Sequence, residues 1–174
     1  MTRPSSKRPL ILILAIIALG ITLDQFTKAL ALDRLTPGVP VPIVSDIFQL
    51  SLLRNPGAAF GTGTSLTLVF SILALLVVIA VAVFIIPKVH SRLWAVAVGL
   101  GMAGVTGNFI DRLIRPPKPF QGHVIDFFAL KYFAVFNVAD VFLTAAAILI
   151  VVIALFVRID LSGSREVVEQ VEEE

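Results

Sequence analysis

The sequence contains no cysteine, and few of its residues carry a charge. The absence of cysteine excludes disulfide bonds, thiol catalysis and thiolate metal sites. Charged residues make up 15% of the chain, against roughly 25% in an ordinary soluble domain. A net charge of +2 is too small to indicate a nucleic-acid partner. Apolar residues make up 57% of the chain and give a mean hydropathy of +0.98, which indicates a membrane protein.

Four apolar segments are long enough to cross a bilayer, for which a helix needs about 20 residues. They are predicted at about 9–32, 66–86, 93–114 and 133–157. The basic N-terminus followed by LILILAIIALG imitates a signal peptide. The helical pattern continues without a break through Asp24 and Lys28, so we expect an uncleaved first helix. The whole chain, residues 1–174, is interpreted as one integral membrane domain.

The segments between the spans carry different signals. In the segment 33–65, three prolines and a glycine between positions 37 and 42 exclude helix, and the alternation of FQLSL then indicates a short strand. The segment 115–132 begins as a rigid turn and becomes strongly apolar, so we expect it to lie along the membrane surface as a short helix. The tail 158–174 holds all five glutamates and is expected in solvent. The predicted fold class is an all-α polytopic membrane protein with four transmembrane helices, a small extracytoplasmic β-sheet and a short surface helix.

The basic residues give a weak signal for orientation. With the N-terminus inside, seven Lys and Arg residues fall inside and seven outside. Lys28, Arg54 and Arg112 are three of the outer ones, and each belongs to a motif that supplies another reason for it. Without them the inner side leads by seven to four, and the N-terminal cluster flanks the first helix directly. We therefore predict that both termini are cytoplasmic.

Polar residues that a bilayer should reject gather near alternate ends of the spans. In four antiparallel spans these ends lie on one side of the membrane, whichever way the protein is inserted. The residues are Asp24, Lys28, Asn55, Asn108, Asp111, Arg112, Asp126, Asn137 and Asp140. One side of the protein is therefore expected to carry the chemistry, because buried ionisable groups in a membrane protein are costly and usually functional.

Several of these patterns have a structural explanation. Asp24 and Lys28 are spaced i, i+4 and can simply pair with each other. Gly99, Ala103 and Gly107 fall on one helix face and are expected to let the third span pack closely against a neighbour. The sequence H-x-x-D at His123 offers too few ligands for a metal, so we predict no metal site and no cofactor. A Ser-His-Asp arrangement is unsupported, because no serine accompanies a histidine on the polar side.

Asp126 and Asp140 are the candidate reactive groups, since each stands in an almost purely apolar context, GHVIDFF and FNVADVF. Two carboxylates brought together in a poorly hydrated site cannot both ionise, so the pair holds one proton. Such a pair can activate water and protonate a leaving amine. Composition alone leaves a peptidase and a proton-coupled transporter equally open. A transporter would need a polar path through the other half of the bundle, and the sequence offers none. A pure scaffold would leave the buried aspartates unexplained.

Five motifs in order resemble the signal peptidase II family, the lipoprotein signal peptidases. They are LDQFTK, NPGAAFG, TGNFIDR, GHVIDFF and FNVAD, and they cover the chain from the first span to the fourth. The resemblance implies a multi-pass aspartyl endopeptidase of the bacterial plasma membrane, with its active site at the outer leaflet. Its implied substrates are diacylglyceryl-modified prolipoproteins, cut just before the lipidated cysteine. It also implies a monomer that contacts membrane lipids, needs no cofactor and binds no nucleic acid.

The resemblance also implies roles for individual residues. The catalytic pair falls on Asp126 and Asp140. Positions that line or support the site match Asn55, Gly57, Asn108, Asp111, Arg112 and Asn137, and Asp24 with Lys28 matches a motif expected to be structural or to position the substrate. The sequence departs from the family where 102–106 replaces a more glycine-rich run, which affects helix packing and not the chemistry.

Overall fold

The structure, a computed structural model, describes residues 7–57 and 65–164. Three parts of the sequence-based account lie outside the described residues. They are the N-terminal basic residue Arg3, the end of the NPGAAFG motif from Ala58 onward, and the acidic tail from Arg165.

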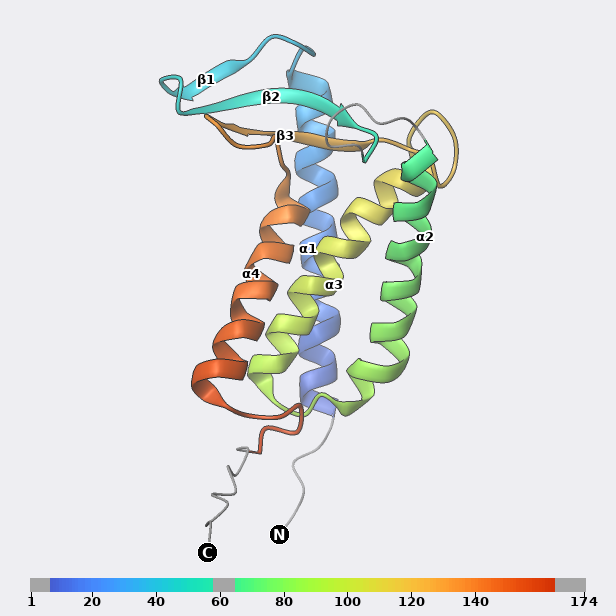
Figure 1. Ribbon diagram of the computed structural model, residues 1–174, viewed down its shortest axis with the longest axis vertical. Coiled ribbons are helices and arrows are strands. Elements are labelled where there is room, and N and C mark those ends of the chain that lie inside the picture. Colours follow the sequence, from blue (N-terminus) through green and yellow to red (C-terminus); the bar gives the residue numbers. More distant parts are fainter. Residues whose placement is uncertain (1–6, 58–64, 165–174) are drawn as a thin grey trace, which may run out of the picture.

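Four helices form a bundle, and each is long and apolar enough to cross a membrane (Figure 1). They are α1 (Lys7–Arg34), α2 (Ser65–Ala80, extended by η1 Val81–Ile85 and η2 Ile86–Lys88), α3 (Arg92–Ile114) and α4 (Val138–Val152, extended by η3 Ile153–Val157). Half of the most apolar stretch of α3 is buried, whereas 17% or less of the corresponding stretch is buried in each of the other three helices. Helix α3 is therefore the centre of the bundle, and the others turn most of their apolar surface outward, as lipid-facing helices do. The four predicted spans are confirmed.

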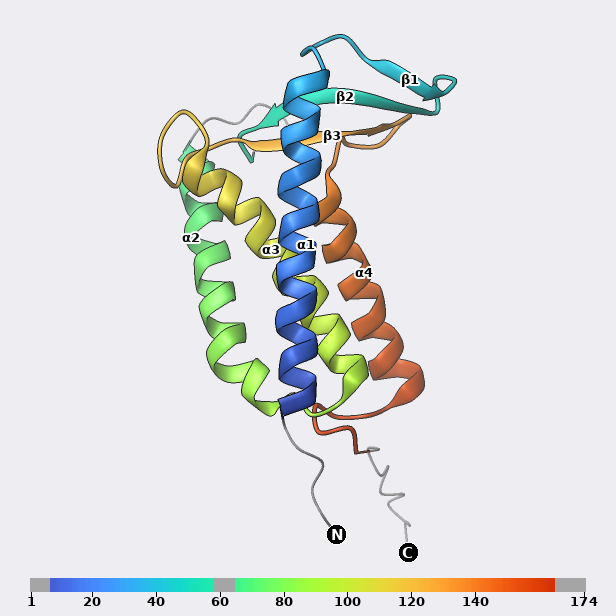
Figure 2. The same cartoon turned by 180° about the vertical axis from the view of Figure 1, so that it is seen from behind.

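Helix α1 crosses α3 closely, as Figure 2 shows from behind. Gly99 packs against Ile16, and an added Cβ there would meet Ile16 at 3.0 Å. About two helical turns further, an added Cβ at Gly107 would meet Asp24 Oδ2 at 2.6 Å, so no side chain fits. The predicted role of the small residues of α3 is thus confirmed: they let a neighbouring helix approach its backbone.

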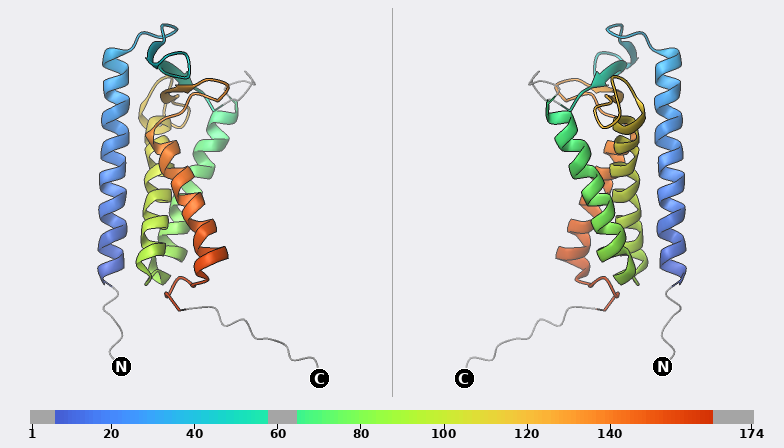
Figure 3. Two further views of the ribbon diagram at one scale, coloured as in Figure 1. Left: turned by 90° about the vertical axis from the view of Figure 1, so that its left-hand side faces the viewer. Right: turned by 90° about the vertical axis from the view of Figure 1, so that its right-hand side faces the viewer.

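A three-stranded antiparallel sheet caps one end of the bundle (Figure 3). Its order is β1 (Val41–Val44), β2 (Phe48–Asn55) and β3 (Val124–Leu130). The first two strands follow α1 in the chain, and β3 comes after α3. The sheet expected after the first span is confirmed, and β3 completes it. Helix α1 begins, and the segment after α4 ends, at the opposite end of the bundle.

The segment between α3 and α4 contains β3 where a short surface helix was predicted, and that prediction was wrong. The run VIDFFAL is apolar apart from Asp126, and its first four residues are buried because both faces of the strand are covered. A strand buried on both faces loses the alternation by which strands are recognised. Helix α4 also begins later than predicted, at Val138 rather than near 133, because Phe136 pairs with Phe128 and Asn137 caps the helix.

Helix α2 holds two loops at the sheet end through its only buried polar residues among those described. Thr67 Oγ1 donates to the carbonyl of Pro56, and Ser71 Oγ donates to the carbonyl of Phe120 at 2.7 Å. Both side chains are almost fully buried. These hydrogen bonds satisfy loop carbonyls that the bilayer would leave unpaired.

Candidate active site

The structure brings the predicted site residues together at the sheet end of the bundle. They come from α1, β2 and its following turn, α3, β3 and the start of α4. In the order of the chain they are Asp24, Lys28, Asn55, Gly57, Asn108, Asp111, Arg112, Asp126, Asn137 and Asp140. The side chains of Asp24, Lys28, Asp111 and Asn137 are completely buried, and Asp126 is 2% exposed.

Asp126 lies in β3 and accepts hydrogen bonds from two amides. Asn137 Nδ2 donates to Oδ1 at 2.6 Å, and Asn55 Nδ2 donates to Oδ2 at 2.9 Å. Each amide is fixed in orientation, because its own oxygen accepts from a backbone N–H. Gly57 N donates to Asn55 Oδ1 at 2.9 Å, and Asp140 N donates to Asn137 Oδ1 at 3.2 Å. Both amides must therefore present N–H groups to Asp126.

The pKa of Asp126 is raised from 3.8 to about 6. Burial is the largest cause, since it disfavours the charged carboxylate. The amide donors Asn55 and Asn137 oppose the rise, and the nearby charge of Asp140 adds to it. Asp126 therefore holds a proton at a higher pH than an ordinary aspartate does.

Asp140 is the third residue of α4 and closes a capping box with Asn137. Its Oδ2 accepts from Asn137 N at 3.0 Å, while its own N–H donates to the Asn137 side chain. Its Oδ1 accepts from Asn108 Nδ2 at 2.8 Å. The positive end of the helix dipole favours a negative charge at this position.

Asn137 connects the two aspartates. Its Nδ2 donates to Asp126 and also to Asn108 Oδ1 at 3.1 Å, and its oxygen and backbone N–H are both used by Asp140. One buried amide thus fixes β3, α3 and α4 relative to one another. The sequence placed Asn137 one helical turn before Asp140, and the structure makes it the N-cap residue of α4.

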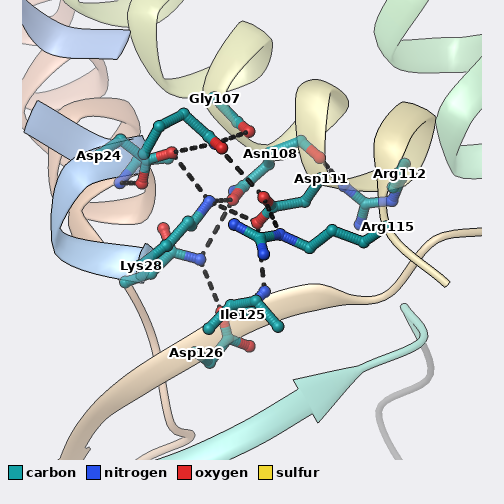
Figure 4. Close-up of polar contacts among 12 residues, drawn as sticks. Asp24, Lys28, Gly107, Asn108, Asp111, Arg112, Arg115, Ile125 and Asp126 are labelled. Carbon is teal, nitrogen blue, oxygen red and sulfur yellow. Dashed lines mark hydrogen bonds and ion pairs between the residues drawn. The ribbon is translucent and has the colours of Figure 1, made fainter. Parts of the chain in front are cut away.

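A buried ion cluster of Asp24, Lys28 and Asp111 adjoins the candidate site, and Figure 4 shows it beside Asp126. Lys28 Nζ contacts Asp24 Oδ2 at 2.9 Å, Asp111 Oδ2 at 2.8 Å and Asn108 Oδ1 at 2.9 Å. These three acceptors match the three protons of an ammonium group. The i, i+4 pair of Asp24 and Lys28 does form, and Asp111 joins it from α3.

The cluster also fixes the backbone on both sides of the site. Asp24 Oδ1 accepts from the N–H of Ala139 at 3.0 Å, and Asp111 Oδ2 accepts from the N–H of Ile125 at 3.2 Å. Ala139 immediately precedes Asp140, and Ile125 immediately precedes Asp126. The position of each candidate catalytic carboxylate is therefore set by a buried aspartate on another helix.

Two members of this cluster were missed by sequence reasoning. Gln25 Nε2 contacts Asp24, the carbonyl of Gly107 and Asp111 at 3.1 to 3.3 Å. Arg115 Nε donates to Asp111 Oδ1 at 2.6 Å. The i, i+4 spacing of Asp111 and Arg115 on a helix was a usable signal. Gln25 had none, because its partners on α3 are more than 80 residues away.

Arg112 and Gly57 lie together at the edge of the site. Gly57 has a positive φ of 89°, which favours glycine, and an added Cβ would approach Phe70 at 3.0 Å and an Arg112 terminal nitrogen at 3.7 Å. Arg112 donates one hydrogen bond, to the carbonyl of Asn108 at 3.3 Å. Its Nε is buried and has no hydrogen-bond partner among the described residues. The guanidinium therefore keeps donors for another group.

An apolar cavity of about 470 Å³ opens beside Asp140. It runs along one face of α4 and below the end of β3, and its lining is almost entirely hydrocarbon. The lining residues are Leu130, Phe133, Phe136, Asp140, Val141, Thr144, Ala145 and Ile148. A candidate catalytic carboxylate thus borders a space suited to an apolar chain.

The described part of the chain contains no group of three or more His, Cys, Asp or Glu residues arranged to hold a metal. His123 and Asp126, the two residues of the H-x-x-D motif, face different surroundings. His123 lines a cavity beside Arg54, whereas Asp126 contacts Asn55 and Asn137.

The sequence matches the family model for signal peptidase (SPase) II over residues 16–156. It is 44% identical over 150 residues to a lipoprotein signal peptidase of Mycolicibacterium smegmatis, covering 86% of this chain and 63% of that one. A lipoprotein signal peptidase of Mycobacterium avium is 40% identical, with 97% of this chain and 94% of that one covered. The similarity thus spans less than two thirds of the first of these relatives and nearly all of the second.

Two solved structures share the fold. One, a bacterial membrane enzyme solved by the in meso method at 1.9 Å, superposes with a TM-score of 0.73 at 30% identity, over 83% of this chain and 92% of that one. The other, also a bacterial membrane enzyme, gives a TM-score of 0.65 at 27% identity, over 89% and 93%. None of these relatives supports the transporter that composition had left open.

Proposed function

The chain belongs to the signal peptidase II family, whose members are multi-pass membrane peptidases that process prolipoproteins, and on this basis we propose that it cuts its substrates with Asp126 and Asp140 as an aspartic catalytic pair. The substrate is a prolipoprotein carrying diacylglyceryl on the cysteine that follows the cut. The observation that carries the proposal is the link between the two carboxylates: Asn137 binds both of them, in a buried site that opens onto an apolar cavity.

The two carboxylates have different surroundings, and these suggest their roles. Asp140 stands at the N-terminus of α4, where a negative charge is favoured, so it acts as the general base. It takes a proton from a water molecule, whose oxygen attacks the carbonyl carbon of the scissile bond. Asp126, with its raised pKa, gives its proton to the leaving amine nitrogen. The proton on Asp140 then returns to Asp126, which restores the pair.

Arg112 is proposed to bind the substrate backbone. Its guanidinium is close to Gly57 and has an unpartnered, buried Nε among the described residues. A donor held in this way is suited to a peptide carbonyl oxygen, on which negative charge develops during attack. Asn55 and Asn108 are supporting residues in this account, since each holds a candidate catalytic carboxylate through its amide.

Asp24, Lys28 and Asp111 are proposed to position the pair and not to touch the substrate. All three are completely buried, and two ion pairs with a hydrogen bond to Asn108 saturate the ammonium of Lys28. Their effect passes through the backbone at Ala139 and Ile125, beside each candidate catalytic residue. A displacement of about 1 Å at a catalytic group is enough to lower a rate severely.

The apolar cavity beside Asp140 is proposed to receive lipid from the substrate. Its hydrocarbon lining suits an acyl chain, and its contact with Asp140 places such a chain close to the candidate site. Anchoring by lipid confines the substrate to the membrane plane, so that few peptide contacts are needed to bring the scissile bond to the carboxylates.

The proposed orientation puts both termini in the cytoplasm and the sheet end at the outer leaflet of a bacterial plasma membrane. It is supported by the excess of basic residues on the inner side once the motif residues are set aside. Trp94 and Tyr132, which suit membrane interfaces, lie near opposite ends of the bundle. The protein is proposed to act as a monomer, because all the residues named here come from one chain.

The function is tested by incubating the purified protein in detergent with a diacylated lipobox peptide. Mass spectrometry should find one cut, directly before the lipidated cysteine. The matched control is the same peptide without diacylglyceryl, which should be cut far more slowly because the apolar cavity is left unfilled. Equal cutting of both peptides would remove lipid recognition from the proposal, and the absence of any cut would refute the function.

A further inference from the structure

A second cavity, lined in part by basic side chains, lies at the sheet end of the bundle, beside the end of α1. Its volume is about 270 Å³. It is lined by Leu32, Arg54, Arg115, Pro116, His123 and Ile125. Three of these six residues are basic or can become so, and among the described residues that line it none is acidic. The cavity is therefore suited to an anion.

This cavity is separate from the candidate active site. Arg54 and Ile125 are direct partners across β2 and β3, so their side chains share one face of the sheet. Asp126 is the next residue along β3 and points to the opposite face, where it contacts Asn55 and Asn137. The substrate site and this cavity therefore lie on opposite faces of β3.

The basic side chains are partly preorganised. Arg115 is held by the bond from its Nε to Asp111 at 2.6 Å, and its side chain is 17% exposed. The terminal nitrogens of its guanidinium are left over, and they match the oxygens of a phosphate. Arg54 is exposed and comes from β2, whereas Arg115 caps the C-terminus of α3. Within the described ranges, neither Arg54 nor His123 has a side-chain hydrogen bond or ion pair.

The depth of the cavity matches the headgroup layer of a membrane. Leu32 follows Lys7 by 25 residues within α1, which corresponds to about 38 Å along a helix. A bilayer with its headgroups is about 40 to 45 Å thick. If Lys7 lies near one surface, Leu32 therefore lies at the level of the phosphates of the other. The apolar side chains of Leu32 and Ile125 would face the glycerol carbons of a lipid.

We propose that this cavity binds the phosphate of an anionic phospholipid headgroup, with Arg54, Arg115 and His123 as its donors. The volume of about 270 Å³ is large enough for a phosphate headgroup, and the acyl chains would remain in the bilayer. Binding also reaches the candidate active site through Arg115. Its partner Asp111 holds Lys28 and the N–H of Ile125, so a lipid that fixes Arg115 stabilises β3 next to Asp126.

The test measures thermal unfolding and lipid retention in nanodiscs of phosphatidylcholine, with and without phosphatidylglycerol. Phosphatidylglycerol should raise the unfolding midpoint of the unaltered protein and remain bound in native mass spectrometry. The double variant Arg54→Gln/His123→Gln should bind it about tenfold more weakly or worse, since charge-assisted hydrogen bonds are lost. Inorganic phosphate added to phosphatidylcholine nanodiscs should give no stabilisation.

Lys118→Gln is the matched control, because it removes one positive charge from the same exposed segment without lining the cavity. It should retain phosphatidylglycerol as the unaltered protein does. Unchanged binding in the double variant would overturn the proposal, as would an equal loss in Lys118→Gln. Stabilisation by inorganic phosphate alone would overturn the lipid as the source of the phosphate. None of these readouts depends on peptidase activity.

Discussion

At the scale of single residues, the two candidate catalytic carboxylates differ in what surrounds them. Asp126 is held by two amides in a nearly closed environment, and Asp140 sits in a helix cap. Burial makes the charged form of Asp126 costly, and a pKa rise from 3.8 to about 6 corresponds to about 3 kcal/mol at most. This destabilisation of the charged form falls on the carboxyl group that the proposed chemistry uses as a proton donor.

Asp126→Asn should therefore change the pH dependence of stability. A carboxyl group whose pKa is raised by folding stabilises the fold fully below its unfolded value, and this contribution is lost as the pH rises through the folded value, here about 6. The neutral Asn does not titrate. The unfolding midpoint of the variant relative to the unaltered protein should rise between pH 4 and pH 8. Thermal unfolding in detergent measures it, and a constant difference across this range would contradict the raised pKa.

Asn137 offers a way to separate its role as the cap of α4 from its role in orienting the two carboxylates. Asn137→Ser keeps an oxygen that can cap α4 but loses the amide donors to Asp126 and Asn108. Cleavage should fall about 100-fold or more, and the loss of the buried amide's hydrogen bonds should lower the free energy of unfolding by about 1 to 3 kcal/mol. Asn137→Ala, the paired variant, should lose cleavage to the same extent and be about 1 kcal/mol less stable than Asn137→Ser, because it also loses the cap. Normal cleavage by Asn137→Ser would show that the amide does not orient the pair.

At the scale of elements, buried ion pairs join α1, α3, α4 and β3. Among the described residues, Lys28 is the only cation within 4.0 Å of Asp24, and Lys28 and Arg115 are the two within 4.0 Å of Asp111. All three side chains in the Lys28 pairs are fully buried. A buried charge that loses its partner is destabilising, because it has no solvent to replace the lost contact.

Lys28→Met should therefore lower the free energy of unfolding by about 3 to 5 kcal/mol. The matched control is Lys131→Met, which breaks the surface pair with Asp46, where the side chains are 41% and 62% exposed. That change should cost less than about 1 kcal/mol. Thermal unfolding of both variants in the same detergent makes the comparison. Similar losses in the two variants would mean that the buried cluster does not hold the elements together.

The sequence predicted some of these elements and not others, for physical reasons. The spans were found because about 20 apolar residues in a row have few other uses. The small residues on one face of α3, Gly99, Ala103 and Gly107, were found because residues four apart on a helix lie on the same face. Strand β3 was missed because an apolar run covered on both faces has no period. The third partner of Lys28, Asp111, lies 83 residues away, and sequence spacing carries no signal for a contact between distant elements.

At the scale of the whole molecule, the two ends of the bundle differ in chemistry. The sheet end holds the buried aspartates, the ion cluster and the cation-lined cavity. At the other end, residues after α4 fold back on the loop before α3, where Trp94 Nε1 donates to the carbonyl of Ile159 at 3.0 Å. The sheet end of the bundle thus carries the candidate catalytic groups, and at the other end the segment after α4 packs against the start of α3.

The proposed orientation is testable because the chain has no natural cysteine. Cysteines introduced at Asp46 and Gln121, at the sheet end, should react with an impermeant thiol reagent added to intact cells. A cysteine introduced at His90, which is exposed in the short loop at the opposite end, is the control and should not react. Labelling at His90 alone would reverse the orientation.

The central claim is that Asp126 and Asp140 act as one catalytic unit, and a double-mutant cycle on cleavage tests it most directly. The initial rate on the diacylated lipobox peptide is measured for Asp126→Asn, Asp140→Asn and the double variant, with Asp46→Asn in the exposed loop as control. Each single variant should lose nearly all cleavage while binding the peptide and remaining folded. The double variant should be little slower than either, because residues that act as a unit are strongly non-additive. Substantial turnover by either single variant, or losses that simply multiply in the double variant, would contradict the account.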